Sequence, residues 1–170
     1  MPNRSEALIP LLPERYQRLV ELPTLEHALD LGPRLREVDL LELRASAGMD
    51  GTAALISSAQ SSALGWTFLN PTSGLPQTMA GLGLMDGEPG VPWALSAPWD
   101  RASLRFFIDV YAIVIKYMHR FAPDMRNYVD ARNRAAWRWL KRAGFEFGPA
   151  QPWGIEQRDF YAFSRRGVYV

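Results

Sequence analysis

Apolar and polar residues along the chain follow two different periods, and these predict where helices and strands lie. In residues 24–48 and 100–124 an apolar residue recurs every three or four positions, which is typical of an amphipathic helix. The stripe expected to face the core in the second segment comprises Leu104, Phe107, Tyr111, Val114, Met118 and Phe121. Shorter apolar runs bounded by Gly, Pro, Asn or Asp predict strands. These runs lie at residues 15–22, 63–69, 77–87, 91–95, 125–131 and 158–166.

Polar residues that can cap a helix stand where helices are expected to begin. Thr24, Asp50 and Asp100 each precede a helical pattern, and each side chain can accept a hydrogen bond from an otherwise unpaired backbone N–H. Gly48 is placed to end a helix in the left-handed conformation. The residues at 32–33, Gly and Pro, are expected to divide the first helical segment into two pieces.

The order of these elements predicts the fold class. Residues 63–69 and 77–87 are joined by NPTSGLP, a turn sequence, and therefore predict a hairpin. Strands and helices then alternate, which indicates an α/β (α+β) fold with one mixed sheet. We expect a single domain over residues 15–170, preceded by a loosely tied arm at 1–14. Residues 146–154, EFGPAQPWG, are rich in Gly and Pro and predict a loop.

Composition excludes several classes of protein. With 48% hydrophobic and 22% charged residues, the chain can form a packed core. A net charge of +1 predicts no strong overall field, which does not favour nucleic acid as a partner. The absence of Cys excludes disulfides and thiolate-bound zinc, and two His residues are too few for a multi-His metal centre, so we expect no metal site. The longest apolar run in the middle of the chain, 110–115, cannot span a bilayer, and residues 1–14 lack the apolar core of a secretion signal. We therefore expect a cytoplasmic protein that makes no contact with membranes.

The segment 133–145, NRAAWRWLKRAGF, has its own start and stop signals. Asn133 can act as the N-cap, and Gly144 supplies the left-handed residue after the last turn. One face is apolar and the opposite face is basic. The basic residues are Arg134, Arg138, Lys141 and Arg142. A solvated basic face explains this pattern, and contact with RNA is a more distant alternative because stacking aromatic residues are not interleaved with it.

The same segment is similar to the helix-and-turn motif of the GNAT superfamily of N-acyltransferases. The matching positions are Asn133, Ala136, Trp139, Gly144 and Phe145. The combination GVPWAL…NYVDARNRAAWRWLKRAGF…QPWGIEQRDFYAF resembles more closely the GNAT-like proteins of short-tailed lytic bacteriophages, over residues 20–165. This resemblance implies a mostly antiparallel central sheet of six or seven strands, flanked by helices, whose fourth and fifth strands splay apart.

The resemblance also implies a cofactor, acetyl-CoA or another acyl-CoA, in the gap between those strands. Its pantetheine arm would bond the edge of the fourth strand, and its pyrophosphate would rest on N–H groups at the start of the long helix. The implied cofactor-binding residues are Trp93, Ala94, Leu95, Ser96, Ala97, Arg101, Ala102, Ser103, Asn133 and Arg138.

The chain departs from the family pattern at two points. The phosphate turn reads SAPWDRAS, without Gly, so Pro98 removes a donor and Asp100 places a carboxylate where pyrophosphate is expected. Leu140 stands where many family members have a Tyr that protonates the leaving thiolate. The remaining candidates for acid or base chemistry are Tyr161, Glu88 and Glu156, and an ordinary structural role is an alternative for each.

Two functions therefore stay open at this point. One is an acyl-CoA-dependent N-acyltransferase, with an amine on a small molecule or on a host protein as the acceptor. The other is a catalytically inactive GNAT-like phage protein that binds a virion protein or a host bacterial protein. Both readings imply the cytoplasm of an infected bacterium, and the second adds the virion.

Overall fold

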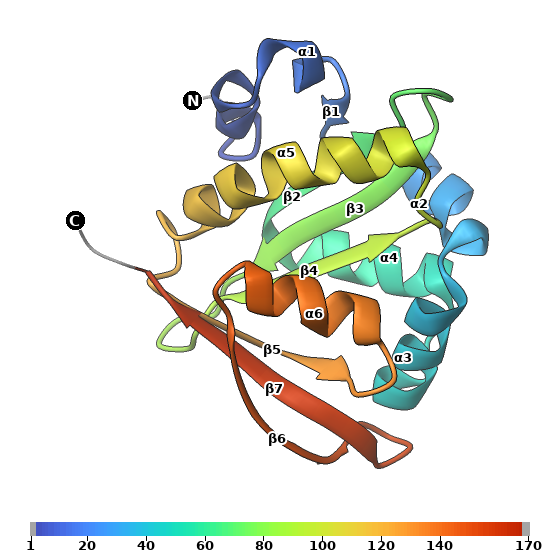
Figure 1. Ribbon diagram of the computed structural model, residues 1–170, viewed down its shortest axis with the longest axis vertical. Coiled ribbons are helices and arrows are strands. Elements are labelled where there is room, and N and C mark those ends of the chain that lie inside the picture. Colours follow the sequence, from blue (N-terminus) through green and yellow to red (C-terminus); the bar gives the residue numbers. More distant parts are fainter. Residues whose placement is uncertain (1–2, 168–170) are drawn as a thin grey trace.

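The computed structural model describes residues 3–167 as two antiparallel sheets lying side by side, with helices on both faces (Figure 1). The four-stranded sheet has the order β1-β2-β3-β4 and the three-stranded sheet has the order β5-β7-β6. The strands are β1 (Val20–Glu21), β2 (Ser62–Leu69), β3 (Pro76–Gly83), β4 (Val91–Ser96), β5 (Asp124–Asp130), β6 (Glu146–Trp153) and β7 (Arg158–Arg166). A single parallel bridge between Gly90 and Met125 joins the sheets.

Each face of the sheets has its own set of helices and its own hydrophobic cluster. The face in front in Figure 1 carries α5 (Arg101–Met118) and α6 (Arg134–Arg142) over the larger cluster. The opposite face carries α2 (Leu25–Leu31), α3 (Glu37–Ala47) and α4 (Gly51–Ser61) over a smaller one. Short helical turns complete the chain: η1 (Glu6–Leu11), α1 (Glu14–Gln17) and η2 (Gly32–Arg34). None of the helices within residues 3–167 is long and apolar enough to cross a membrane.

The predicted fold class is confirmed, and so are the predicted helix caps. Thr24, Asp50 and Asp100 each accept a hydrogen bond from the backbone N–H three residues later. Gly48 adopts φ of 67°, the left-handed conformation expected after α3. The N-cap Asn133 accepts from the N–H of Ala136 at 3.3 Å. Local sequence signals therefore place the starts of α2, α4, α5 and α6 correctly.

The N-terminal arm differs from its prediction. Its described part is fixed to the domain, because Leu8 and Leu12 are buried in the larger cluster and the carbonyl of Ser5 accepts from the indole N–H of Trp66 at 2.8 Å. The strand predicted at 15–22 is wrong except for its end. That segment forms the short helix α1 and only two residues of strand, since its apolar positions alternate imperfectly.

The apolar stripe predicted for α5 is displaced by about one position. The residues buried in the core are Ser103, Phe106, Val110, Val114, Ile115, Tyr117 and Met118. Leu104 is 44% exposed, and Phe107 and Tyr111 are half-buried. α5 is apolar around most of its circumference, so the sequence offers two overlapping stripes. The second stripe faces α6, where the Phe107 and Trp139 rings lie 5.1 Å apart.

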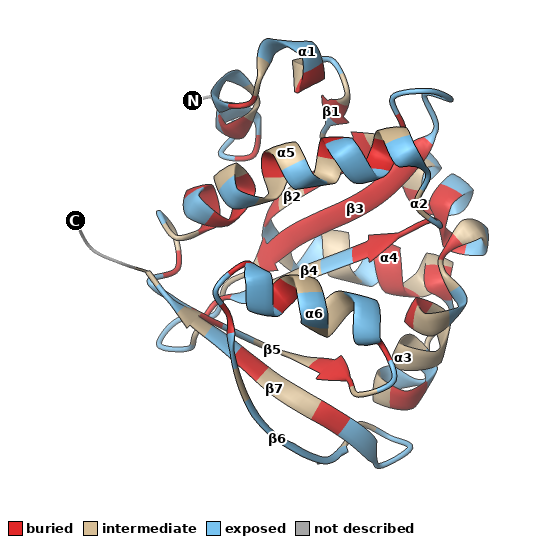
Figure 2. Cartoon of the chain, viewed as in Figure 1, coloured by how far each residue is buried: buried red, intermediate tan, exposed pale blue. Residues whose placement is uncertain are grey.

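The loop predicted at 146–154 is instead strand β6, paired with β7 at the outer edge of the small sheet (Figure 2). An edge strand needs only half of its N–H groups for pairing, and this tolerates proline. Pro152 lies opposite Asp159 of β7, and Pro149 lies within a register shift between Phe147 and Ala150. The Gly and Pro residues therefore mark an edge strand with a bulge.

Candidate functional site

The fourth and fifth strands diverge from the point where the two sheets meet. The N–H of Gly90 donates to the carbonyl of Asp124 at 2.9 Å, and the carbonyl of Gly90 accepts from the N–H of Arg126 at 2.8 Å. The next link is a side chain: the Asn127 amide donates to the carbonyl of Pro92 at 2.9 Å, and its oxygen accepts from the N–H of Tyr128 at 2.8 Å. The Asn127 side-chain amide thus makes the hydrogen bonds that a peptide group of a paired strand would make. Beyond Asn127, β4 and β5 are not paired.

Main-chain groups of β4 are left without a neighbouring strand along this gap. In an antiparallel pair alternate residues bond the partner strand, and the N–H of Ala97 donates to the carbonyl of Gln77 at 2.8 Å. By this register the main-chain N–H and C=O groups of Trp93, Leu95 and Ala97 point toward β3. The same groups of Ala94 and Ser96 point toward the gap. By this register the N–H and C=O of Ala94 and the N–H of Ser96 have no partner on β3, and no bond to another segment is found for them within the described residues. Ala94 is exposed, whereas Ser96 is buried. Of the five positions predicted to bind the arm, residues 93–97, two offer such groups.

Aromatic side chains lie on both faces of the sheet beside the gap. The Trp93 side chain lies on the α4 side, where its indole N–H donates to the hydroxyl of Ser62 at 2.7 Å and its ring covers Gly81. On the other face, Trp99 and Trp139 pack on opposite sides of Phe107, at 5.2 and 5.1 Å between ring centroids. These rings fill the contact between α5 and α6.

The start of α5 is already occupied by an acidic side chain. The Asp100 carboxylate accepts from the N–H of Ser103 at 2.8 Å and from the amide of Asn70 at 2.7 Å. The Ser103 hydroxyl in turn accepts from the N–H of Asp100 at 3.0 Å. The hydrogen bond from Asn70, followed by those from Ser103, lowers the pKa of Asp100. The turn thus holds an ionised carboxylate where the family resemblance implies pyrophosphate, and its main chain does not fit a second anion.

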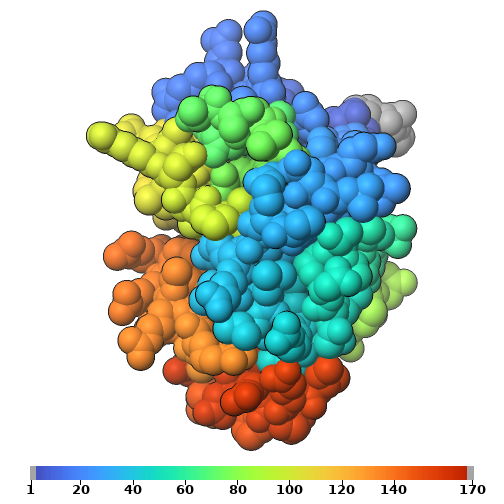
Figure 3. Space-filling view, turned by 90° about the vertical axis from the view of Figure 1, so that its right-hand side faces the viewer, coloured from blue at the N-terminus to red at the C-terminus, as the bar shows by residue number. Residues whose placement is uncertain are grey.

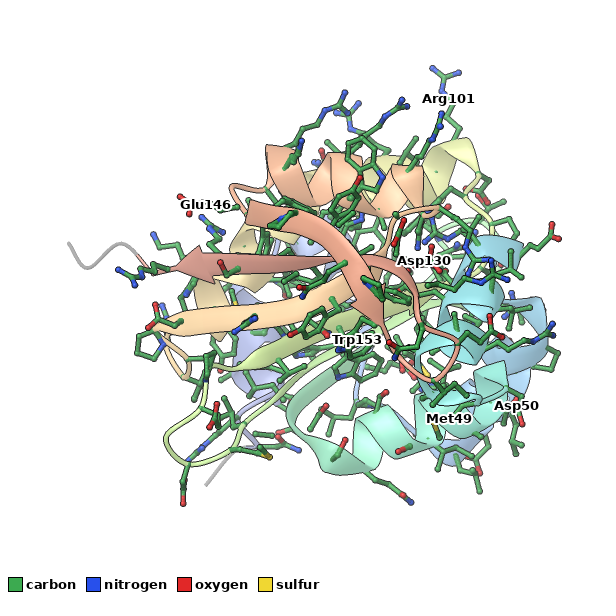
Figure 4. The ribbon with its side chains drawn as sticks, turned by 90° about the horizontal axis from the view of Figure 1, so that it is seen from below. Met49, Asp50, Arg101, Asp130, Glu146 and Trp153 are labelled. Atoms are coloured by element: carbon green, nitrogen blue, oxygen red, sulfur yellow. The ribbon has the colours of Figure 1, made fainter. Side chains whose placement is uncertain are left out.

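Three acidic side chains, Asp39, Glu42 and Asp130, gather at the open end of the gap, and we call them the acidic cluster. Asp39 and Glu42 lie three residues apart on α3, and Asp130 ends β5 beside that helix (Figure 4). Glu42 Oε2 accepts from the N–H of Asp130 at 3.2 Å and from the amide of Asn133 at 3.1 Å. The same amide donates to Asp39 Oδ1 at 3.1 Å.

The Asp130 N–H locates Glu42 within the gap. The N–H groups of even-numbered β5 residues face β4, because that of Arg126 bonds Gly90 and the odd-numbered ones pair with β7. Across the gap, the N–H of Arg36, just before α3, donates to the carbonyl of Ser96 at 3.0 Å. The first two turns of α3 thereby connect the two strands at the open end.

Charge is distributed unevenly in the acidic cluster. Arg36 forms two hydrogen bonds with Asp39, at 2.7 and 2.8 Å, and Arg132 pairs with Asp130 at 2.6 Å. Glu42 has no such cation. Burial of its carboxyl, together with the charges of Asp39 and Asp130, raises the pKa of Glu42 to about 7, although Asn133 and the Asp130 N–H favour the ionised form. Glu42 therefore changes charge near neutral pH.

The predicted acid and base candidates lie apart from one another. Glu88 is in the turn between β3 and β4, and Glu156 is in the turn after β6, where its carboxylate is 3.5 Å from Arg158. Tyr161 lies on β7, with its ring 6.2 Å from that of Trp137. No hydrogen bond or ion pair within residues 3–167 joins any two of the three, and their catalytic roles stay predictions.

The residues of α5 and α6 that were predicted to contact the cofactor differ in exposure and in hydrogen bonding. Arg101 and Arg138 are exposed, and side chains from the start of α5 (yellow) and from α6 (orange) project from the same side of the molecule in Figure 3. Ala102 is half-buried, and Ser103 is buried with its hydroxyl engaged in the α5 cap. The amide hydrogens of Asn133 are both used within the acidic cluster. A direct role of Asn133 in cofactor binding stays a prediction.

Sequence reasoning missed Glu42. The available signal was the spacing of Asp39 and Glu42, which puts two acids three residues apart on a helix whose neighbouring positions are apolar. Acidic residues on the buried side of a helix need partners, and the sequence did not show which distant residues provide them. No three His, Asp or Glu side chains in the described part of the chain are arranged to bind a metal.

Comparison with solved structures identifies the fold. The GNAT-family acetyltransferase from Bacillus anthracis superposes with a TM-score of 0.63, at 9% sequence identity, over 86% of this chain and 93% of that one. Ard1 from Thermoplasma volcanium gives 0.62, at 13% identity over 88% and 97%. The ribosomal-protein-S18-alanine N-acetyltransferase from Escherichia coli gives 0.60, at 10% identity over 89% and 94%. No family model and no curated protein sequence matches this chain. At these identities the likeness shows the fold alone: the chain has the GNAT acetyltransferase fold.

Proposed function

We propose that this protein is an N-acyltransferase that binds the pantetheine arm of an acyl thioester along the free edge of β4 and transfers the acyl group to an amine. The observation that carries the proposal is the gap beyond Asn127, where Ala94 and Ser96 present main-chain groups without partners. Pantetheine contains two amide groups, and an extended amide chain can bond a strand edge as another strand does.

Glu42 is the base in this proposal. The bridge between Gly90 and Met125 sets the register, so Asp130 is level with Leu95, about one residue (~3.3 Å) beyond Ala94. Within the described residues Glu42 Oε1 accepts no hydrogen bond, so it can receive a proton. A carboxylate with a pKa near 7 suits an amine of pKa about 8, the value of a protein α-amino group.

The bound thioester supplies an activated acyl carbon. Glu42 Oε1 takes a proton from the ammonium form of the acceptor, and the amine nitrogen then forms the C–N bond while the C–S bond breaks. The leaving thiolate takes up the second proton from the amine through solvent, since a thiol pKa near 8.5 makes a dedicated acid unnecessary. The buried Leu140 is compatible with this scheme.

Replacement of Ala94 tests the proposal directly. Ala94→Pro removes only a gap-facing N–H, and β4 already tolerates proline at Pro92, two positions earlier and facing the same way. We expect calorimetric titration to show acetyl-CoA binding that Ala94→Pro weakens about tenfold, the loss of roughly one hydrogen bond. Ala94→Gly keeps the N–H and is the matched control. No heat and no melting shift with millimolar acetyl-CoA would contradict the proposal.

The acceptor is the next part of the proposal. One of the similar structures is named for acetylating the alanine of a ribosomal protein, and the sequence resembles proteins of lytic bacteriophages. We therefore extend the proposal to a phage protein that acts in the cytoplasm of an infected bacterium, with a host protein or small amine as acceptor. Release of free thiol from acetyl-CoA, measured with peptides bearing free N-termini and with polyamines, tests this extension.

One observation favours a second function. Asp100 occupies the turn where family resemblance implies pyrophosphate, which suits a GNAT-like protein without catalytic activity that binds a virion or host protein. The titration with acetyl-CoA separates the two, because the second function requires no thioester binding.

A further inference from the structure

We infer that the site recognises acyl-pantetheine thioesters through their arm alone, with the Asp100 carboxylate standing in for the diphosphate at the start of α5. The inference rests on the proposed function and specifies its donor. Its chemical class is an acyl group on pantetheine, whether the pantetheine belongs to coenzyme A or to a carrier protein.

The first argument is that Asp100 is held in place from several directions. Its carboxylate bonds the N–H of Ser103 and the amide of Asn70, as described above. Asn70 is itself fixed, because its amide also donates to Gln77 Oε1 at 3.0 Å and its oxygen accepts from the N–H of Thr72 at 2.8 Å. Asn70 and Gln77 are both buried. Moving the carboxylate aside for an anion would break this network.

The second argument is that the turn has few backbone donors for an anion. The carbonyls of Ala97 and Pro98 accept from Nε2 of the buried Gln77, at 2.9 and 3.2 Å, and the N–H of Asp100 donates to the Ser103 hydroxyl. Pro98 has no N–H, and the turn lacks glycine, which would let an anion approach the backbone closely. The side chain of Arg101 is exposed and is one cation against this carboxylate. A diphosphate would meet like charge in the turn.

The third argument is that the arm site remains intact. Ala94 and Ser96 precede the turn, and their gap-facing groups do not depend on Asp100. The expected cofactor site therefore has only one of its two parts available. The edge of β4 can bond the pantetheine arm, whereas the start of α5 is occupied by the Asp100 carboxylate. A donor bound in this way leaves its nucleotide in solvent.

Calorimetric titrations of the full chain with acetyl-CoA, S-acetylpantetheine and 3′,5′-ADP test the inference. We expect the two thioesters to bind with dissociation constants within about threefold of each other, and 3′,5′-ADP not to bind at millimolar concentration. Asp100→Asn and Asp100→Ser keep a side chain that caps a helix but remove the charge. Both should tighten acetyl-CoA about five- to tenfold and leave S-acetylpantetheine unchanged. Asp50→Asn, which alters the equivalent cap of α4, is the matched control and should change neither.

Binding of acetyl-CoA by the natural chain at least about thirtyfold more tightly than S-acetylpantetheine overturns the inference. If neither thioester binds, the proposed function fails. A separate measurement with inorganic pyrophosphate then tests whether Asp100 excludes a diphosphate from the start of α5. Pyrophosphate should raise the melting temperature of the two Asp100 variants and leave the natural chain and Asp50→Asn unchanged; an equal rise in all four refutes it. Acylated carrier protein binding more tightly than S-acetylpantetheine identifies a carrier as the source, and equal or weaker binding identifies free coenzyme A.

Discussion

The raised pKa of Glu42 predicts an unusual dependence of stability on pH. The pKa is about 7 in the fold against an ordinary value of 4.5, so between these two pH values the folded state keeps a proton that the unfolded chain has lost. A group whose folded pKa is raised contributes stability below the ordinary value, and that stability is lost as the pH rises through the folded pKa. Neutral Glu42 therefore stabilises the fold at pH 5, and ionised Glu42 does so no longer at pH 8.

The size of the effect follows from the two pKa values. A difference of two and a half pKa units corresponds to about 3 kcal/mol. Because Glu42 as a residue is partly exposed, solvent screens part of this, and we expect about 1–3 kcal/mol. Glu42→Gln keeps an oxygen for the N–H of Asp130 but stays neutral. It should therefore gain this amount relative to the natural chain between pH 5 and pH 8.

Urea unfolding followed by tryptophan fluorescence at both pH values, at fixed ionic strength, measures the difference. Other titrating groups occur in both proteins and cancel, and Glu37→Gln, an exposed acid on the same helix, is the matched control. The slopes of free energy against urea should agree between the proteins, so that midpoints report stability. If Glu42→Gln and the natural chain differ by the same free energy at pH 5 and pH 8, Glu42 is an ordinary carboxylate and cannot be the base proposed above.

Two further substitutions test the framework around the gap. Asn127→Ala removes the amide hydrogen bond to the carbonyl of Pro92, which links β5 to β4 beyond the bridge, and the bond that its oxygen accepts from the N–H of Tyr128 within β5, so it should lower the free energy of unfolding by about 1–3 kcal/mol; a urea midpoint equal to that of the natural chain would show that Asn127 does not hold the strands. Gly154→Ala should be destabilising by at least about 1 kcal/mol, because φ is +75° and a Cβ would lie 2.5 Å from the carbonyl of Ala45. Gly74→Ala, at φ of +72° with nothing within 4 Å, isolates the backbone contribution, and equal melting temperatures for the two variants would contradict the crowding at Gly154.

Local signals in the sequence were sufficient for much of the fold. Caps such as Thr24 and Asn133 act on backbone groups within three residues, so their neighbours alone specify them. The residues of β6 defeated the same reasoning, because Pro152 is acceptable only at a sheet edge, and a position at an edge is set by the whole topology.

The candidate site was predictable only in part for the same reason. The free edge of β4 followed from a family resemblance that fixes the order of strands, and the negative turn at Asp100 could be read directly from its residues. Glu42 could not be found, because its pKa is set first by burial and then by contacts with residues such as Asn133 and Asp130, which lie 91 and 88 positions away in sequence. Neither periodicity nor charge pattern carries information about such contacts.

The distance in sequence between Glu42 and Asp130 has a consequence for the order of events during synthesis. Contacts between distant segments form after local ones, because closing a long loop costs entropy. A ribosome has made α3 well before β5 emerges, so the nascent chain holds the glutamate with no hydrogen-bond donor from the later strand. Glu42 thus acquires these surroundings only after β5 has been made, and a polypeptide cut short before residue 130 has the helix without the hydrogen bond from Asp130.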